Sequence, residues 1–216
     1  MIKLIRSFLV FLAFSTCAFG QTPAKTLAGV YNSYSGTFTI AIDKSGRLTG
    51  CYDYFDHWDD QLKVYETQHT FYVSGKSTDG KVFSVTARDY ISDNPAIGTI
   101  TFTANVLTIK LPELSVDAGF DVSGKDGKNT FTLVQPKFYT AIMYVKAKPG
   151  EKQHKATLFD FKDGVFTARK AYLLQGNLVY CLESVQNHTR IIYQNWMTGK
   201  QTEYWIQNDE LMPVPN

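Results

Sequence analysis

Alternation of apolar and polar residues is the feature that most constrains how this chain can fold. In the segment GTFTIAID, residues 36–43, Phe38, Ile40 and Ile42 share one face of an extended chain, and small or polar side chains share the other. The same period of two, typical of half-buried β-strands, recurs in segments 69–75, 81–89, 97–111 and 129–135. The turn sequences DKSG, STDG and GKDG occur among these segments. This spacing predicts an all-β antiparallel meander, and six to nine strands with one apolar face favour closure into a barrel.

The first twenty residues predict an exported protein. Lys3 and Arg6 precede a short apolar run, and Ala18-Phe19-Gly20 supplies the small residues of a cleavage site. This pattern is typical of a secretory signal peptide, residues 1–20, with Gln21 as the mature start. Lipidation at Cys17 is the alternative. We therefore expect a periplasmic or secreted location.

Charge and hydropathy narrow the classes of partner. The chain has 22 basic and 20 acidic side chains, and the signal peptide contains two of the basic ones. The mature chain is therefore balanced, which gives no indication of a nucleic-acid partner. No segment after the signal peptide is long and apolar enough to be a transmembrane helix.

The two remaining cysteines, Cys51 and Cys181, leave two alternatives open. In an oxidising compartment an even pair suggests a disulfide, which here would join the two halves of the chain. The other alternative is two separate buried thiols. The alternation places Cys51 on the face opposite Leu48, and Cys181 on the same face as Val179.

A break in the pattern near Gln135-Pro136-Lys137 divides the chain. Strands are predicted again at 138–147 and 155–161, with the turn KPGEKQ between them. Further short strands and frequent turns follow, and no helix is indicated. We predict a signal peptide (1–20), a β-barrel domain (21–135) and a second β domain (136–216).

Two segments of the second domain match the sequence pattern of a known domain family. They are AYLLQGNLVYCLE, residues 171–183, and GKQTEYWIQNDEL, residues 199–211. Gly176 lies at the expected tight turn, Trp205 in the terminal strand and Asp209 in the closing turn. Over residues 137–213 the chain resembles bacterial SH3-like domains, although Tyr204 replaces the glycine usual before the tryptophan. The resemblance implies a small five-stranded barrel that binds peptidoglycan or proteins in an exported bacterial protein.

The N-terminal domain has a second resemblance. GVYNSYSGTFTIAIDKSGRLTGCY, residues 29–52, starts with Gly-x-Tyr and ends with Leu-x-Gly-x-Tyr. It is similar to the opening of lipocalin-like small barrels. That likeness implies an architecture, together with the hypothesis of a small-molecule carrier.

The candidate binding site lies a few residues after Cys51. Large aromatic side chains, which dominate interface hot spots, alternate there with acids that would complement a basic partner. The predicted recognition loop consists of Tyr54, Phe55, Asp56, His57, Trp58 and Asp59. The alternative interpretation is the polar end of a strand running into a solvated hairpin loop.

The same stretch does not follow the patterns of metal or catalytic sites. Its acids lack the central glycine and terminal glutamate of a calcium loop, and the four histidines of the chain are scattered. Asp59 and Asp60 are neighbours, so in a strand they would point to opposite faces. We therefore predict no metal, no cofactor and no enzymatic activity.

The sequence thus predicts an exported, non-enzymatic binding protein. The first hypothesis is an inhibitor or immunity protein that acts on a periplasmic protein partner of basic charge. The alternatives are a cell-envelope module that binds peptidoglycan through the SH3-like domain, and a small-molecule carrier that uses the N-terminal barrel.

Overall fold

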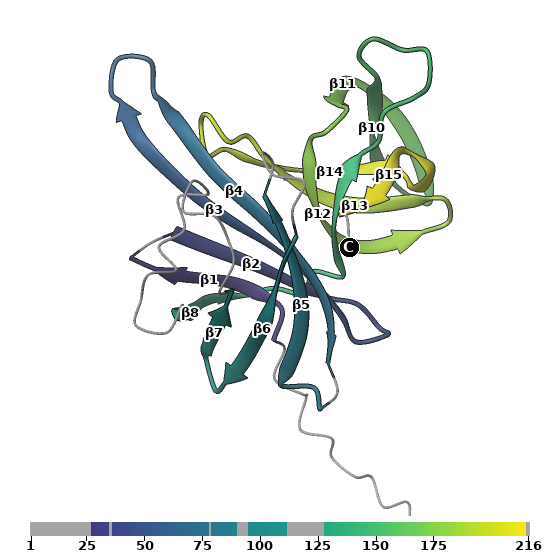
Figure 1. Ribbon diagram of the computed structural model, residues 1–216. Coiled ribbons are helices and arrows are strands. Elements are labelled where there is room, and N and C mark those ends of the chain that lie inside the picture. The colour runs from purple at the N-terminus through teal and green to yellow at the C-terminus, as the bar shows by residue number, and fades with distance from the viewer. Residues whose placement is uncertain (1–26, 35, 78, 90–94, 112–127, 215–216) are drawn as a thin grey trace, which may run out of the picture.

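The computed structural model describes residues 27–34, 36–77, 79–89, 95–111 and 128–214 (Figure 1). The predicted signal peptide, its cleavage before Gln21 and the alternative at Cys17 lie outside these residues, as does the predicted turn at 124–127. The described part is built from β-strands and contains no α-helix. It therefore has no helix that could cross a membrane.

Eight antiparallel strands form a closed barrel, which confirms the predicted meander and its closure. Each strand pairs with the next along the chain, and the last closes on the first. The strands are β1 (Gly29–Ser33), β2 (Gly36–Ile42), β3 (Arg47–Asp59), β4 (Val64–Ser77), β5 (Val82–Asp89), β6 (Ala96–Thr103), β7 (Val106–Lys110) and β8 (Lys128–Pro136).

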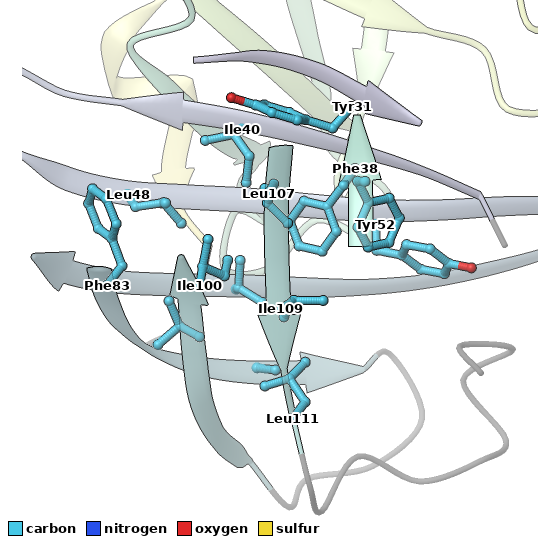
Figure 2. Packing of buried hydrophobic residues seen from close by; sticks show 14 of the residues in the cluster. Tyr31, Phe38, Ile40, Leu48, Tyr52, Phe83, Ile100, Leu107, Ile109 and Leu111 are labelled. Atoms are coloured by element: carbon cyan, nitrogen blue, oxygen red, sulfur yellow. The ribbon is translucent and has the colours of Figure 1, made fainter. Parts of the chain in front are cut away.

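Side chains fill the interior of this barrel (Figure 2). The residues that alternation predicted to face inward, such as Phe38 and Ile40, are fully buried. Phe38 contacts Phe71 and Phe131 edge to face, with ring centroids 5.8 and 5.5 Å apart. An eight-stranded barrel is just wide enough for side chains to fill, so apolar burial supplies the driving force for this half of the molecule.

Close strand contacts in the barrel depend on glycine. A Cβ atom added to Gly98 in β6 would lie 1.9 Å from the Lys110 carbonyl oxygen at the end of β7. The two strands could not keep this spacing with any larger residue at that position.

The second half is one sheet in the order β11-β10-β14-β13-β12-β9-β15. Its seven strands exceed the five that the resemblance implied, and the SH3-like arrangement is not confirmed. The 3₁₀ turn η2 (Asn208–Glu210) precedes the last strand. The strands are β9 (Ala141–Val145), β10 (Lys155–Lys162), β11 (Val165–Leu174), β12 (Leu178–Val185), β13 (His188–Gln194), β14 (Gln201–Gln207) and β15 (Leu211–Pro213).

The barrel and the second sheet share a buried face. Apolar residues on the outside of β2, β3 and β4 pack against residues of the second sheet and of the chain on either side of it. The buried members of this interface cluster are Ala41, Cys51, Tyr72, Tyr139, Ile142, Tyr180, Ile192 and Val214. The backbone N–H of Ile142 also donates to the Thr49 hydroxyl at 3.0 Å.

The two cysteines are free thiols, so the predicted alternative of a disulfide between Cys51 and Cys181 does not hold in this structure. Cys51 belongs to the interface cluster. Cys181 points to the other face of β12, away from its neighbour Tyr180, and packs in a separate core. Burial raises the pKa of the Cys181 thiol to about 12. Burial and the charge of Asp53 raise the pKa of Cys51.

Candidate functional site: the tip of the β3–β4 hairpin

The hairpin of β3 and β4 is the longest in the barrel and extends beyond its neighbours (Figure 1). Its two strands stay paired from Arg47 with Lys76 to Asp59 with Val64. In the described part of the chain, β2 flanks β3 only as far as Asp53, and β5 flanks β4 only from Phe71 onward. Residues 54–69 therefore form a two-stranded ribbon, here called the hairpin tip.

All six residues of the predicted recognition loop lie in a strand. Tyr54 to Asp59 belong to β3, and the connecting loop is residues 60–63. The placement of these residues in a loop was wrong, and the alternative interpretation, the polar end of a strand running into a hairpin loop, agrees with the structure. The aromatic residues favour a strand and pair across the ribbon.

Aromatic rings cluster on the hairpin tip. Tyr65 contacts Trp58 and Phe55, with ring centroids 4.8 and 5.2 Å apart. Tyr54 stacks on His69 closer to the barrel, at 6.0 Å. Trp58 keeps 45% of its surface exposed. The rings thus stabilise a ribbon that would be marginal alone, and they leave an aromatic surface open to a partner.

The acids of the tip hold its shape. The Asp59 carboxylate accepts the backbone N–H groups of Gln61 and Leu62 at 2.7 and 2.8 Å, which fixes the turn. Asp60 accepts the indole N–H of Trp58 at 3.0 Å and so orients the ring.

Asp56 lies beside His57, whose φ of +55° interrupts the extended strand. The hairpin tip contains one lysine, Lys63, and four acids, Asp56, Asp59, Asp60 and Glu66. The net charge of the tip is therefore negative.

A loop of the second sheet supports the hairpin tip. The backbone N–H of Tyr65 donates to the carbonyl oxygen of Met197 at 3.1 Å. Met197 and Trp196 are both exposed, in the loop between β13 and β14. Asn195 closes this loop, because its backbone oxygen accepts the Gly199 N–H at 2.8 Å.

The exposed and half-buried apolar side chains of the hairpin tip and of this loop form the candidate binding surface. We call the set the tip surface: Phe55, Trp58, Leu62, Tyr65, Trp196 and Met197. Leu62 is the most open of them, at 72% exposure. Sequence reasoning missed Trp196 and Met197. Their signal was an apolar pair inside the turn-forming sequence NWMTGK, where polar residues are the rule.

The base of the hairpin is fixed to the second sheet by Asp53. Its carboxylate accepts the Thr70 hydroxyl at 2.8 Å and, more weakly, the Tyr180 hydroxyl at 3.4 Å. The Cys51 thiol lies 3.4 Å from the same carboxylate. Burial and the nearby Asp53 charge raise the pKa of Tyr180, so this phenol stays protonated. The hairpin is thus attached to the second sheet at its base and at its tip.

The residues predicted from the SH3-like resemblance lie elsewhere in the second sheet. Gly176 adopts the predicted permissive backbone, with φ of +83°, in the turn before β12. Trp205 is buried in β14 and contacts Phe161 and Phe166, at centroid distances of 5.2 and 5.4 Å. Asp209 is exposed in η2.

Sequence reasoning also missed a charge cluster built around a buried pair, His154 and Glu210. His154 lies between Glu210 and Glu151, and its Nδ1 is 2.8 Å from the Glu151 carboxylate. Lys148 Nζ donates to Glu210 at 2.6 Å. The hydrogen bond to Glu210 raises the pKa of His154, against burial, which lowers it. Burial opposes ionisation of Glu210, but hydrogen bonds from Lys148 and His154 outweigh it and lower its pKa. The cluster joins the loop before β10 to η2.

Within the described ranges, no three His, Cys, Asp or Glu side chains are grouped so that they could hold a metal ion. Comparison of the chain with family models, with curated proteins and with solved structures finds no match. Its function must therefore be inferred from its own residues.

Proposed function

We propose that this chain is a non-enzymatic binding protein that captures a basic segment of a protein partner with the tip surface. The observation that carries the proposal is the exposed aromatic and apolar side chains on a ribbon that the second sheet supports at both ends. A partner would meet these side chains with little further loss of conformational freedom.

The chemistry of the tip surface supports this choice of partner. Tryptophan and tyrosine are the residues that contribute most binding energy in protein interfaces, and Trp58 and Tyr65 lie beside each other here. The acids around them would attract a basic segment and speed its association. Because Asp59 and Asp60 already accept backbone and indole N–H groups, their carboxylates serve positioning and electrostatics rather than catalysis.

Export is part of the proposal. The signal-like segment at residues 1–20 supports a periplasmic or secreted location, where an inhibitor or immunity protein would meet a foreign or cell-wall enzyme.

A capture experiment with three immobilised proteins tests the proposal. Wild type, Trp58→Ala and the matched control Ile97→Ala are exposed to periplasmic extract. Ile97 is an exposed apolar residue of β6 outside the tip surface. We expect wild type and Ile97→Ala to retain the same basic protein, Trp58→Ala to lose it, and captured protein to decrease with salt. Equal capture by all three proteins would reject the tip surface as the binding site.

A second candidate function has its own observation. The rings of Phe166 and His188 stack with centroids 3.8 Å apart, and the buried Trp205 packs against Phe166. Phe166 and His188 are only half-buried, and the electron-rich faces of such rings would stack on a sugar ring. This cluster supports the alternative of a peptidoglycan-binding second domain. Sedimentation with purified sacculi tests it: wild type should co-sediment and Phe166→Ala should not, and a wild type that stays in solution would exclude the alternative.

A further inference from the structure

A large pocket lies at the barrel end opposite the hairpin tip. The turns after β2, β4 and β6 converge there, and the pocket has a volume of about 890 Å³. This volume is within the range of small-molecule sites. We call it the mouth pocket.

The floor of the mouth pocket is aromatic. Phe83 and Phe102 line it, and their rings meet edge to face with centroids 5.7 Å apart. Figure 2 shows Phe83 at one end of the packed interior, next to Leu48. Because side chains fill the barrel beyond this floor, a ligand would lie across the mouth and not inside the barrel.

One wall comes from the segment that joins the barrel to the second sheet. Phe138, Tyr139 and Thr140 line the pocket, and Phe138 is 78% exposed. The backbone N–H of Ile42 donates to the Tyr139 carbonyl at 3.2 Å, which fixes this segment against the barrel. The exposed phenyl ring of Phe138 therefore extends the apolar wall at the rim without taking part in a core.

Two lysines supply positive charge at the rim. Lys76 and Lys81 line the pocket, both are exposed, and neither forms an ion pair with a described residue. Asp79, the acid in the same turn, uses its carboxylate to accept the backbone N–H groups of Lys81 and Val82 at 2.8 and 2.7 Å. The two ammonium groups therefore remain available to an anion.

We infer that the mouth pocket binds a small amphipathic anion, with its apolar body against Phe83, Phe102 and Phe138 and its acidic group at Lys76 and Lys81. The aromatic floor would contact the apolar body of the ligand. The two lysines, which form no ion pair with a described residue, would bind its acidic group. This site is separate from the tip surface, and the inference does not depend on the proposed protein partner.

Calorimetric titration with dodecanoate and with dodecanol, its uncharged analogue, tests the inference. We expect wild type to bind dodecanoate more tightly than dodecanol. The double variant Lys76→Gln/Lys81→Gln should bind dodecanoate about five- to tenfold more weakly, since exposed charge pairs contribute modestly, and its affinity for dodecanol should stay within about twofold of wild type. The control Lys110→Gln/Lys170→Gln removes two exposed lysines outside the pocket and should bind both ligands as wild type does.

Two further measurements locate the ligand. The methyl resonances of Ile42 and Ala28, which line the pocket, should shift on titration with dodecanoate, and that of Ala156 in the second sheet should not. Phe138→Ser, at an exposed position, should weaken the binding of both ligands while the protein stays folded. Absence of dodecanoate binding, unchanged affinity in the double lysine variant, or shifts confined to residues outside the pocket would each overturn the inference.

Discussion

Replacing Glu210 with glutamine tests whether its bond to His154 holds the C-terminal turn against the second sheet. The substitution keeps the size of the side chain and removes its charge. His154 and Glu210 are both buried, so the bond between them is a charge-assisted hydrogen bond shielded from water. Glu210 also accepts a hydrogen bond from Lys148 Nζ, so the substitution removes the negative charge from two bonds. Because Lys148 is partly exposed and His154 is buried, we expect most of the loss, about 2 kcal/mol of the free energy of unfolding, to come from the bond to His154. With a urea m value of about 2 kcal/mol/M, the unfolding midpoint should fall by about 1 M.

The pH dependence of this loss follows from the two pKa shifts. The pKa of His154 is raised from its ordinary 6.5. The contribution of this side chain to the free energy of unfolding is therefore complete below pH 6.5 and is lost as pH rises through the pKa of the folded protein. The pKa of Glu210 is lowered from 4.5, so its contribution is complete above pH 4.5 and is lost as pH falls through the folded value. The difference in free energy of unfolding between wild type and Glu210→Gln should therefore be largest between pH 4.5 and pH 6.5 and decrease on either side.

Urea unfolding followed by circular dichroism across this pH range measures the difference. Asp209→Asn is the matched control, because it removes the same charge from an exposed neighbour in η2. We expect it to change stability by less than about 0.5 kcal/mol. A Glu210→Gln protein as stable as wild type at pH 6, or a difference that grows at alkaline pH, would refute the reasoning.

Two other predictions concern the barrel and the thiols. Gly98→Ala should lower the free energy of unfolding by about 3 kcal/mol in urea, because the added Cβ would lie 1.9 Å from the Lys110 carbonyl oxygen. The neighbouring control Thr99→Ala should lower the free energy of unfolding far less. Cys51 and Cys181 should resist a thiol reagent in the folded protein and both react, without added reductant, after unfolding in urea. Rapid labelling of either thiol under native conditions would contradict their burial.

The barrel could be predicted from the sequence because one physical rule determines it. A period of two places Phe38 and Ile40 on the same face, and a chain with several such strands buries that face most completely by closing on itself. The alternation also placed Cys51 outside the barrel core and Cys181 with Val179, as the structure confirms.

The site could be predicted only in part, because its supports are distant in sequence. Trp58 and its acids were visible as an unusual cluster, but the bond from Tyr65 to Met197 joins residues with no local pattern in common. The contact of His154 with Glu210 likewise spans 56 residues. Such pairs are set by how the second sheet packs on the barrel, and alternation within single strands does not determine that packing.

The buried face between barrel and second sheet has a consequence for dividing the molecule. A barrel separated from the sheet would present Ala41, Cys51 and Tyr72 to water as a continuous apolar strip, and such strips promote aggregation. The Ile142 N–H would lose the Thr49 hydroxyl that it bonds. We therefore expect the two halves to unfold as one cooperative unit, in a single calorimetric transition on heating. A fragment limited to either half should aggregate and be poorly soluble.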